Sequence, residues 1–282
     1  MTSLHDSDAD LPLAGLPSAG RTLLRTAPVE LAIAEIRFAS VGESVSIEQA
    51  LAIKELMEQQ GISYPSMEPA QKNELTVEFG PSGASPQVQV RSKGWQFSQG
   101  EGQTLATILP DSLVVQTSQY ERWSVSLQPA LHALLRGAET HLKPQLLQRL
   151  GVRYVNRLID PNATSALAWR GRISDSFLGP VLDPVLGEKV VAAQQQLELS
   201  LGDAQGALLR HGAFRDAAAQ NAVSYLMDID VFDASMQRFS SADVMEKAKR
   251  LNRTALSLLK QAIEPTYWEE LPNRVAGKSD SD

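Results

Sequence analysis

Two arginines in the stretch GVRYVNRLID, residues 151–160, are the first candidates for chemistry in this sequence. The decamer is rich in β-branched and other apolar residues, which predicts a β-strand. Because side chains alternate between the two faces of a strand, Arg153 and Arg157 lie on the same face. A guanidinium binds a carboxylate or a phosphate through paired hydrogen bonds. This face therefore holds structural ion pairs or binds an anion from outside.

Two aspartates in a later predicted strand offer the matching charge. The stretch YLMDIDVFD, residues 225–233, places Asp228 and Asp230 on one face, since their spacing is also even. If the two strands pair, these carboxylates meet Arg153 and Arg157, and we prefer this structural ion-pair interpretation. Such a network would fix strand register as much as it adds net stability, because desolvation offsets much of the attraction.

Two functional alternatives stay open for the same residues. Arg153 and Arg157 would act as an anion clamp if their face lined a cleft, with a phosphate or a carboxylate as ligand. Asp228 and Asp230 would hold Mg²⁺, which prefers carboxylate oxygens, in a metal-dependent enzyme acting on a phosphate-bearing small molecule or nucleic acid. The D-x-D pair lacks an evident third ligand, so the metal interpretation is the weaker of the two.

No complete catalytic set accompanies these residues. The chain has four histidines and no cysteine, and no two histidines have a zinc-binding spacing. The motifs G-x-S-x-G, G-x-x-x-x-G-K-[ST] and G-x-G-x-x-G do not occur, so serine hydrolases, P-loop ATPases and dinucleotide-binding enzymes lack support. We therefore predict no catalytic residues and no cofactor, and we favour a protein that is not an enzyme.

Five aromatic residues form a further candidate group, and two interpretations apply to them. Interleaved with basic residues, they could stack on the bases of single-stranded nucleic acid. We prefer core or rim packing, with the first two under a helix and the next two at a helix entry. The five residues are Trp95, Phe97, Tyr120, Trp123 and Tyr154.

The composition bounds the partners and the compartment. The 282 residues are 43% hydrophobic and 21% charged, with a net charge of −7 and a pI of about 5.2. An acidic balance disfavours broad DNA binding, so a protein partner or a homo-oligomer is expected, and nucleic acid is a weaker option. No apolar run approaches the roughly 18 residues of a membrane span, and no signal peptide is recognisable. We expect a soluble, cytoplasmic protein without a membrane partner.

The elements that must position these residues follow one plan twice. In the first half the predicted strands are 29–38, 73–80, 87–98, 102–110 and 111–120, with helices at 46–61 and 122–142. In the second half the predicted strands are 151–160, 189–201, 206–214 and 222–233, with a short helical turn within 170–184 and a long helix at 241–265. Ser46 and Ser240 or Ser241 are the expected N-caps, and Pro129 predicts a late start or a kink.

This order predicts an α+β fold of two similar β-α-βββ(β)-α halves. One antiparallel sheet, or two, would be covered on one face by the long helices. The predicted organisation is a flexible segment at 1–26, a first half at 27–145, a second half packed on it at 146–268, and a flexible tail at 269–282.

Three short motifs carry a resemblance to a known family. They are W-x-F-S at Trp95, Tyr-x-x-Trp at Tyr120, and G-x-R-Y-x-N-R at Gly151. In this order they resemble a sporadically distributed, uncharacterised family of bacterial and archaeal proteins, over roughly residues 27 to 268. The resemblance brings no catalytic residues. The sporadic distribution implies an accessory role in a defence, toxin–antitoxin or mobile-element system, and we expect a binding or interaction protein.

Overall fold

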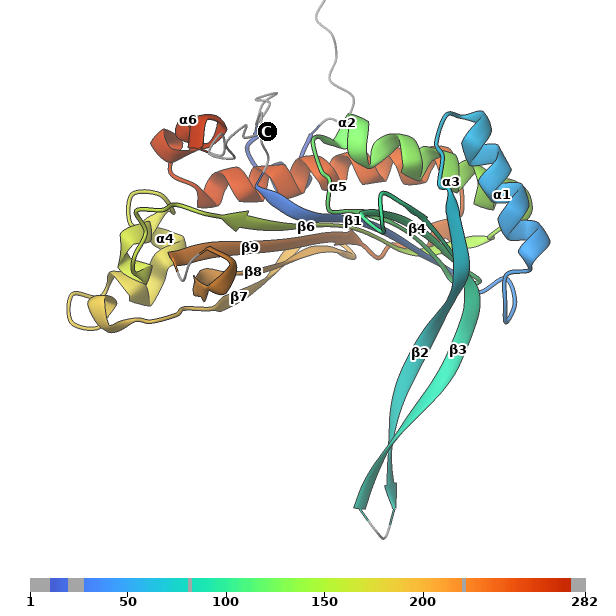
Figure 1. The fold of residues 1–282 in the computed structure, drawn as a ribbon, viewed down its shortest axis with the longest axis horizontal. Helices are drawn as coiled ribbons and strands as arrows, with labels where there is room; N and C mark the ends of the chain where they lie inside the picture. Colours follow the sequence, from blue (N-terminus) through green and yellow to red (C-terminus); the bar gives the residue numbers. More distant parts are fainter. Residues whose placement is uncertain (1–10, 20–27, 81–82, 220–221, 275–282) are drawn as a thin grey trace, which may run out of the picture.

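The protein is a mixed α+β structure built on one large antiparallel sheet, as the ribbon in Figure 1 shows. The computed structural model describes residues 11–19, 28–80, 83–219 and 222–274, and for 73–80, 83–91 and 272–274 it describes the backbone alone. The ten strands have the order β2-β3-β4-β5-β1-β6-β9-β8-β7, with the short β10 paired to β6. The strand pairs within this part of the chain are antiparallel.

The strand bounds match the predicted ones for β1 and β9 and depart most from them for β2, β6 and β7. The strands are β1 Val29–Phe38, β2 Ser66–Gly80, β3 Gly83–Gln99, β4 Thr104–Leu109, β5 Ser112–Thr117, β6 Leu146–Leu158, β7 Gln195–Gly202, β8 Gln205–Asp216, β9 Ala222–Asp233 and β10 Gln237–Arg238. Strand β6 begins five residues before the predicted start at 151, and β2 begins seven residues before 73. Pairing with a neighbour extends both strands beyond their apolar stretches.

Two of the helices, the ones that follow Ser46 and Ser240, begin at their predicted caps. The helices are α1 Ile47–Gln59, α2 Trp123–Ser126, α3 Gln128–His141, α4 Asp175–Leu178, α5 Ser241–Ala262 and α6 Pro265–Arg274. Ser46 forms a capping box with Gln49, and Ser240 caps α5 by accepting a hydrogen bond from the Asp243 N–H. Pro129 lies in the first turn of α3, so the predicted helix at 122–142 is divided in two. Within the described residues no helix is long and apolar enough to cross a membrane.

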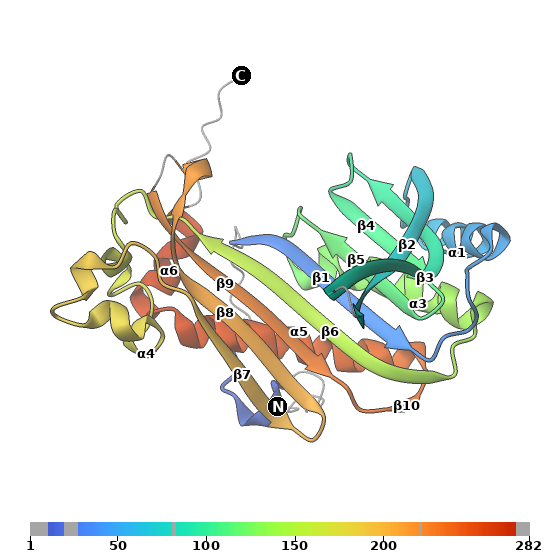
Figure 2. The same ribbon diagram turned by 90° about the horizontal axis from the view of Figure 1, so that it is seen from below.

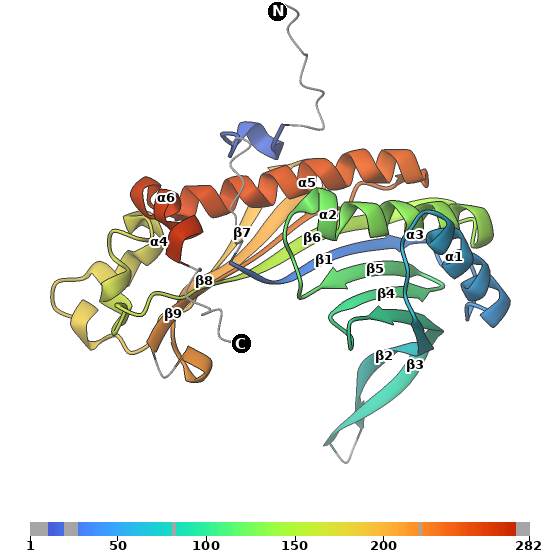
Figure 3. The ribbon, with the colours of Figure 1, turned by 45° about the horizontal axis from the view of Figure 1, so that its top comes forward.

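Strand β6 shows how the sheet sorts its side chains. Val152, Tyr154 and Asn156 are buried, whereas Arg153 and Arg157, between and beside them, are partly exposed. Helix α5 packs across β6 and β9 on the buried side, as Figure 3 shows. Its apolar stripe contributes the buried residues Val244, Ala248, Leu251, Ala255, Leu258 and Leu259. The arginines of β6 therefore lie on the side of the sheet that faces away from α5.

Two segments predicted to be flexible contain ordered structure. Leu13 and Ala19 are buried, and the Leu13 N–H donates to Thr254 Oγ1 of α5 over 2.9 Å. Residues 11–19 therefore dock on the body, in contrast to the flexible segment predicted for 1–26, because their apolar side chains find a buried site. Helix α5 ends at Ala262, three residues before the predicted end at 265, and α6 begins at Pro265, so Leu271 in the predicted tail is buried. The other residues of the predicted segments, 1–10, 20–26 and 275–282, lie outside the described part of the chain.

Candidate binding surface on the open side of the sheet

Ten charged residues from four adjacent strands are joined by ion pairs on the side of the sheet away from α5, the side viewed in Figure 2. We call this set the ion-pair face. Its members are Glu30, Glu35 and Arg37 of β1, Arg149, Arg153 and Arg157 of β6, Asp228 and Asp230 of β9, and Arg210 and Asp216 of β8. Five arginines meet five carboxylates, so the face is neutral as a whole.

The centre of the ion-pair face is Asp228, which two arginines share. Arg153 donates to both of its carboxylate oxygens, from Nε over 2.7 Å and from Nη2 over 2.8 Å. Arg210 donates to Asp228 from Nη1 over 3.2 Å and to Gln196 from Nε. The Asp228 side chain is only 7% exposed, against 40% for Arg153 and 36% for Arg210. The predicted contact of Arg153 with the aspartate strand is therefore present. The group of two arginines and one aspartate carries one excess positive charge.

Asp230 completes a second group with an arginine that the sequence analysis did not single out. Arg149 donates to Asp230 and to Glu35, each over 3.2 Å, and Glu35 also binds Arg37. The Arg149 guanidinium lies 5.1 Å from the ring centre of Phe232, which is a cation–π contact. Positive and negative groups alternate along this chain, so it carries no net charge.

Arg157 does not reach the aspartates with which it was predicted to pair. Its Nε and Nη2 donate to Asp216 of β8, and its Nη1 donates to Glu30 of β1 over 2.7 Å. The register explains this correction, because Arg157 lies opposite Leu226, two residues beyond Asp228 toward the start of β9. A register shift between Val29 and Leu31 displaces Glu30 from the regular alternation of β1. This third group carries one excess negative charge.

The pKa values of these groups follow their partners. The hydrogen bond to Asp228 raises the pKa of Arg153, and the one to Glu30 raises that of Arg157. Burial tends to raise the pKa of Asp216, but the hydrogen bond and charge of Arg157, together with the hydrogen bond from the Ala218 N–H, hold the pKa below its ordinary value. Arg153, Arg157 and Asp216 are therefore charged at neutral pH.

The metal interpretation of Asp228 and Asp230 finds little support in this geometry. Both carboxylates lie on one face, as predicted, but each is engaged by a guanidinium, so a Mg²⁺ ion would have to displace an arginine. In the part of the chain that is described, no three His, Asp or Glu side chains are grouped so that they could hold a metal ion.

The five aromatic candidates lie away from the ion-pair face. Phe97 and Tyr154 are buried, Trp123 is nearly so, and Trp95 and Tyr120 pack partly buried against the same core. The Trp95 Nε1–H donates to the Val45 carbonyl, and Tyr154 donates to Asn252 of α5 over 2.8 Å. These rings serve packing in this structure, which agrees with the interpretation we prefer and leaves no exposed row for stacking bases.

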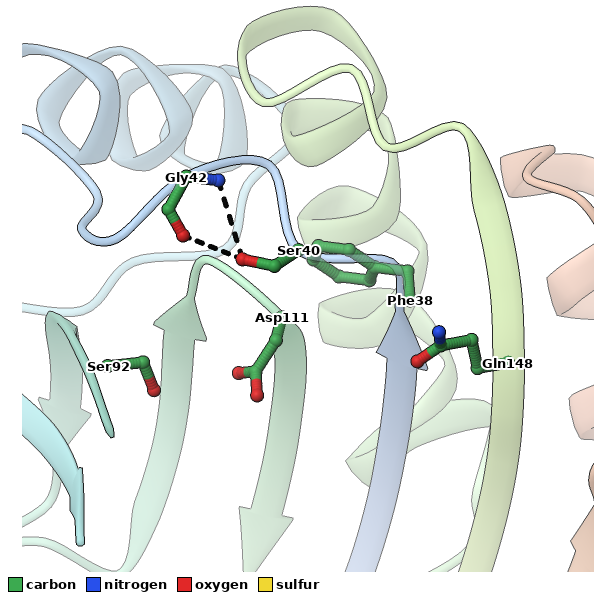
Figure 4. Close-up of a pocket in the computed structure, with 6 residues that line it drawn as sticks. All are labelled: Phe38, Ser40, Gly42, Ser92, Asp111 and Gln148. Atoms are coloured by element: carbon green, nitrogen blue, oxygen red, sulfur yellow. Dashed lines mark hydrogen bonds between the residues drawn. The ribbon is translucent and has the colours of Figure 1, made fainter. Parts of the chain in front are cut away.

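A polar hollow of about 240 Å³ lies near the end of β1, and Figure 4 shows its lining. Asp111 accepts hydrogen bonds from Lys72 Nζ over 3.0 Å and from Ser112 Oγ over 3.1 Å. The Ser92 hydroxyl is buried and has no hydrogen-bond partner among the described residues. The hollow falls below the roughly 300 Å³ of ordinary small-molecule sites, and no histidine lines it to act as a base for its serines.

The sequence contained signals for some of the missed partners. Arg149 lies four residues before Arg153, which places it on the same face, but the predicted strand begins at residue 151. Asp216 lies just beyond the predicted end of its strand at residue 214. Arg210 lies inside a predicted strand, and its role follows only from the pairing of β8 with β9.

Comparison with known proteins adds no identity to this geometry. No protein-family model matches the chain, and no curated protein is significantly similar to it.

Proposed function

We propose that the protein is a non-enzymatic binding protein whose ion-pair face receives a protein partner. The observation that carries this proposal is the composition of the face, where charged side chains of both signs lie on four adjacent strands and remain partly exposed. Half-buried apolar residues, such as Ile33 and Val155, lie between them. Such a mixture of apolar area and fixed, oriented charge is what gives a protein interface its specificity.

The charge pattern also favours the kind of partner. The group around Asp228 carries the excess positive charge, and the group around Arg157 carries the excess negative charge. Arg153 and Arg157, which belong to these two groups, lie about 13 Å apart along β6, at roughly 3.3 Å per residue. A partner with an acidic side chain and a basic side chain at that spacing would complement both. The most exposed members of the face are Arg37, Arg153, Arg210 and Glu30. A partner can bind these side chains without breaking the ion pairs beneath.

Co-purification from the native cells tests the proposal. The variant Arg37→Ala with Arg210→Ala removes two exposed guanidiniums and leaves the pairs of Arg153 and Arg149 in place. The matched control, Lys249→Ala with Arg253→Ala, removes the same charge from α5. We expect proteins that are enriched with the wild type and the control, elute with salt, and are lost with the face variant. Equal recovery with both variants contradicts the proposal.

A specific observation supports anion binding as the alternative. Asp228 neutralises only one of the two arginines that share it, so a phosphate-bearing small molecule or nucleic acid would find one uncompensated guanidinium. Calorimetric titration with inorganic tripolyphosphate, with and without Mg²⁺, tests this alternative. Saturable binding that Arg210→Ala abolishes would support it. Heat that is absent, or unchanged in the variant, would reject it.

Four finer statements belong to the same proposal. The two-half plan is supported by the matching element order, β1-α1 to β5-α3 and β6-α4 to β9-α5. Cover of one sheet face by the long helices is supported by the packing of α5 on β6 and β9. We also propose a cytoplasmic location, from the composition, and an accessory role in a defence, toxin–antitoxin or mobile-element system, which only the family resemblance implies.

A further inference from the structure

The outer part of the β2–β3 hairpin projects from the body of the protein. Strand β4 pairs with β3 only over Trp95–Gln99, so residues 73–80 of β2 and 83–90 of β3 continue beyond the rest of the sheet. Figures 1 and 3 show this arm extending away from the helices, and no other described element is drawn beside its outer half.

The register of the arm sorts its residues by polarity. Residues that pair across an antiparallel ladder share a face, and so do every second residue along a strand. One face holds Asn73, Leu75, Val77 and Phe79 of β2 with Ala84, Pro86, Val88 and Val90 of β3. The other face holds Glu74, Thr76, Glu78, Ser85, Gln87 and Gln89. The first set, which we call the apolar arm face, contains no charged residue.

A bulge in β3 is what brings the apolar residues together. The partner of Lys72 is Ser92 and the partner of Asn73 is Val90, so Arg91 is the extra residue of this irregularity. In the body of the sheet the apolar residues of β3 are the odd-numbered Trp95 and Phe97, whereas in the arm they are even-numbered. Without the bulge, Val88 and Val90 would lie on the face opposite Leu75 and Val77. The apolar residues of β3 thus change from odd-numbered to even-numbered positions at the same place where the bulge inserts its extra residue.

An apolar face on a two-stranded arm is unfavourable in water. A two-stranded hairpin is at best marginally stable by itself, and contiguous exposed apolar area marks a site of association. The central strands avoid this problem through the ion-pair face. The apolar arm face has no such charges, so a cover from outside the chain would stabilise it.

We propose that the apolar arm face packs against the same face of a second copy of this chain. Each copy carries a net charge of −7, so two copies repel, and a contact through an uncharged surface adds the least to this repulsion. A two-fold contact requires only one self-complementary patch, and two twisted ribbons pack as two layers about 10 Å apart.

The area fits a dimer of moderate affinity. Six large apolar residues of the face would each bury roughly 60–120 Å², from the usual transfer energies at about 25 cal/mol per Å². The two copies together would bury roughly 700–1,400 Å², which reaches the lower end of the range for specific interfaces, about 1,200 Å². The dimer should therefore dissociate on dilution. This inference goes beyond the ion-pair face, because the two surfaces use different residues and each can fail alone.

Analytical ultracentrifugation of the full chain over a range of concentrations tests the proposal. We expect the wild type to approach twice the chain mass of 30.7 kDa as concentration rises. Val77→Asp buries a charge in each half of the contact and should weaken association by at least roughly 100-fold. The matched control Thr76→Asp adds the same charge on the polar face and should dimerise like the wild type.

Deletion of Arg91 provides a second variant that adds no charge. It removes the bulge, so the apolar residues of the two arm strands no longer share a face, and the dimer should be lost. Circular dichroism and the melting temperature show whether each variant is folded. A wild type that is monomeric at every concentration overturns the proposal. Dimers that form equally in Val77→Asp and Thr76→Asp overturn it as well.

Discussion

The central strands and the outer β2–β3 arm belong to the same sheet, yet their surfaces differ in composition: one is charged and the other has an uncharged face. Strands β1, β6, β9 and β8 carry a network of arginines and carboxylates on the side away from α5. The register of the arm instead collects uncharged residues on one face and polar residues on the other. No described helix lies on the ion-pair face or beside the outer part of the arm, so the two regions differ in the residues that their surfaces hold.

This difference separates two ways of building an interaction surface. Interleaved ion pairs keep a sheet face hydrated and admit only a partner that matches the charges. An uncharged, apolar face is stabilised by any apolar surface that covers it. The same face of a second copy is such a surface, and it is present wherever the protein is. Substitutions should therefore alter folding stability in the central strands and association in the arm.

The largest expected effect is the loss of the shared carboxylate. Asp228→Ala leaves Arg153 and Arg210 without their common partner, and the partly exposed guanidiniums recover some hydration. We expect a loss of about 2–3 kcal/mol in the free energy of unfolding by urea at pH 7. Asp230→Ala, at a more exposed position, should cost about 1 kcal/mol. The comparison breaks if the two losses are equal, or if Asp228→Ala dissociates a dimer without lowering stability.

A smaller effect is expected at Arg157, which pairs with the buried Asp216. Arg157→Ala should cost about 1–2 kcal/mol at neutral pH, because Asp216 is left charged and only 5% exposed. The pKa of Asp216 is lowered in the folded protein, so the stability of this pair is present above the unfolded pKa of about 3.9 and is lost as the pH falls below it. The difference between wild type and variant in urea unfolding should shrink from pH 5 to pH 3. A constant difference would show that the cost is packing alone.

The smallest effect is expected on the covered side of the same sheet. His211 is 1% exposed, its Nδ1 lies 2.8 Å from the Tyr225 hydroxyl, and burial lowers its pKa. The unfolded chain then binds a proton that the folded protein resists, so stability is full above about pH 6.5 and falls as the pH drops below it. The slope is at most about 1.4 kcal/mol per pH unit. His211→Gln should reduce the pH dependence of the unfolding free energy between pH 6.5 and 5. A pH dependence that persists unchanged in the variant would contradict this assignment.

Local signals in the sequence predicted most of the elements. The Ser46 and Ser240 caps, the division near Pro129 and the alternation of β1 and β9 all act within a few residues, which is the range that a sequence pattern reports. Errors arose where another segment decides the outcome. Pairing with β3 extends β2, and burial against the body orders both residues 11–19 and α6.

The sequence by itself determined that Arg153 and Arg157 share a strand face, that Asp228 and Asp230 share another, and that opposite charges would be close if those strands met. The alternation of side chains between the two faces is a property of each strand by itself, so it can be predicted from the sequence of one strand. Only the tertiary structure decided the partners, because register and strand order place β6 between β1 and β9 and bring β8 within reach. That arrangement gives Arg153 to Asp228 and Arg157 to Asp216 and Glu30, and it leaves the Arg153 side chain 40% exposed but the Arg157 side chain only 17% exposed.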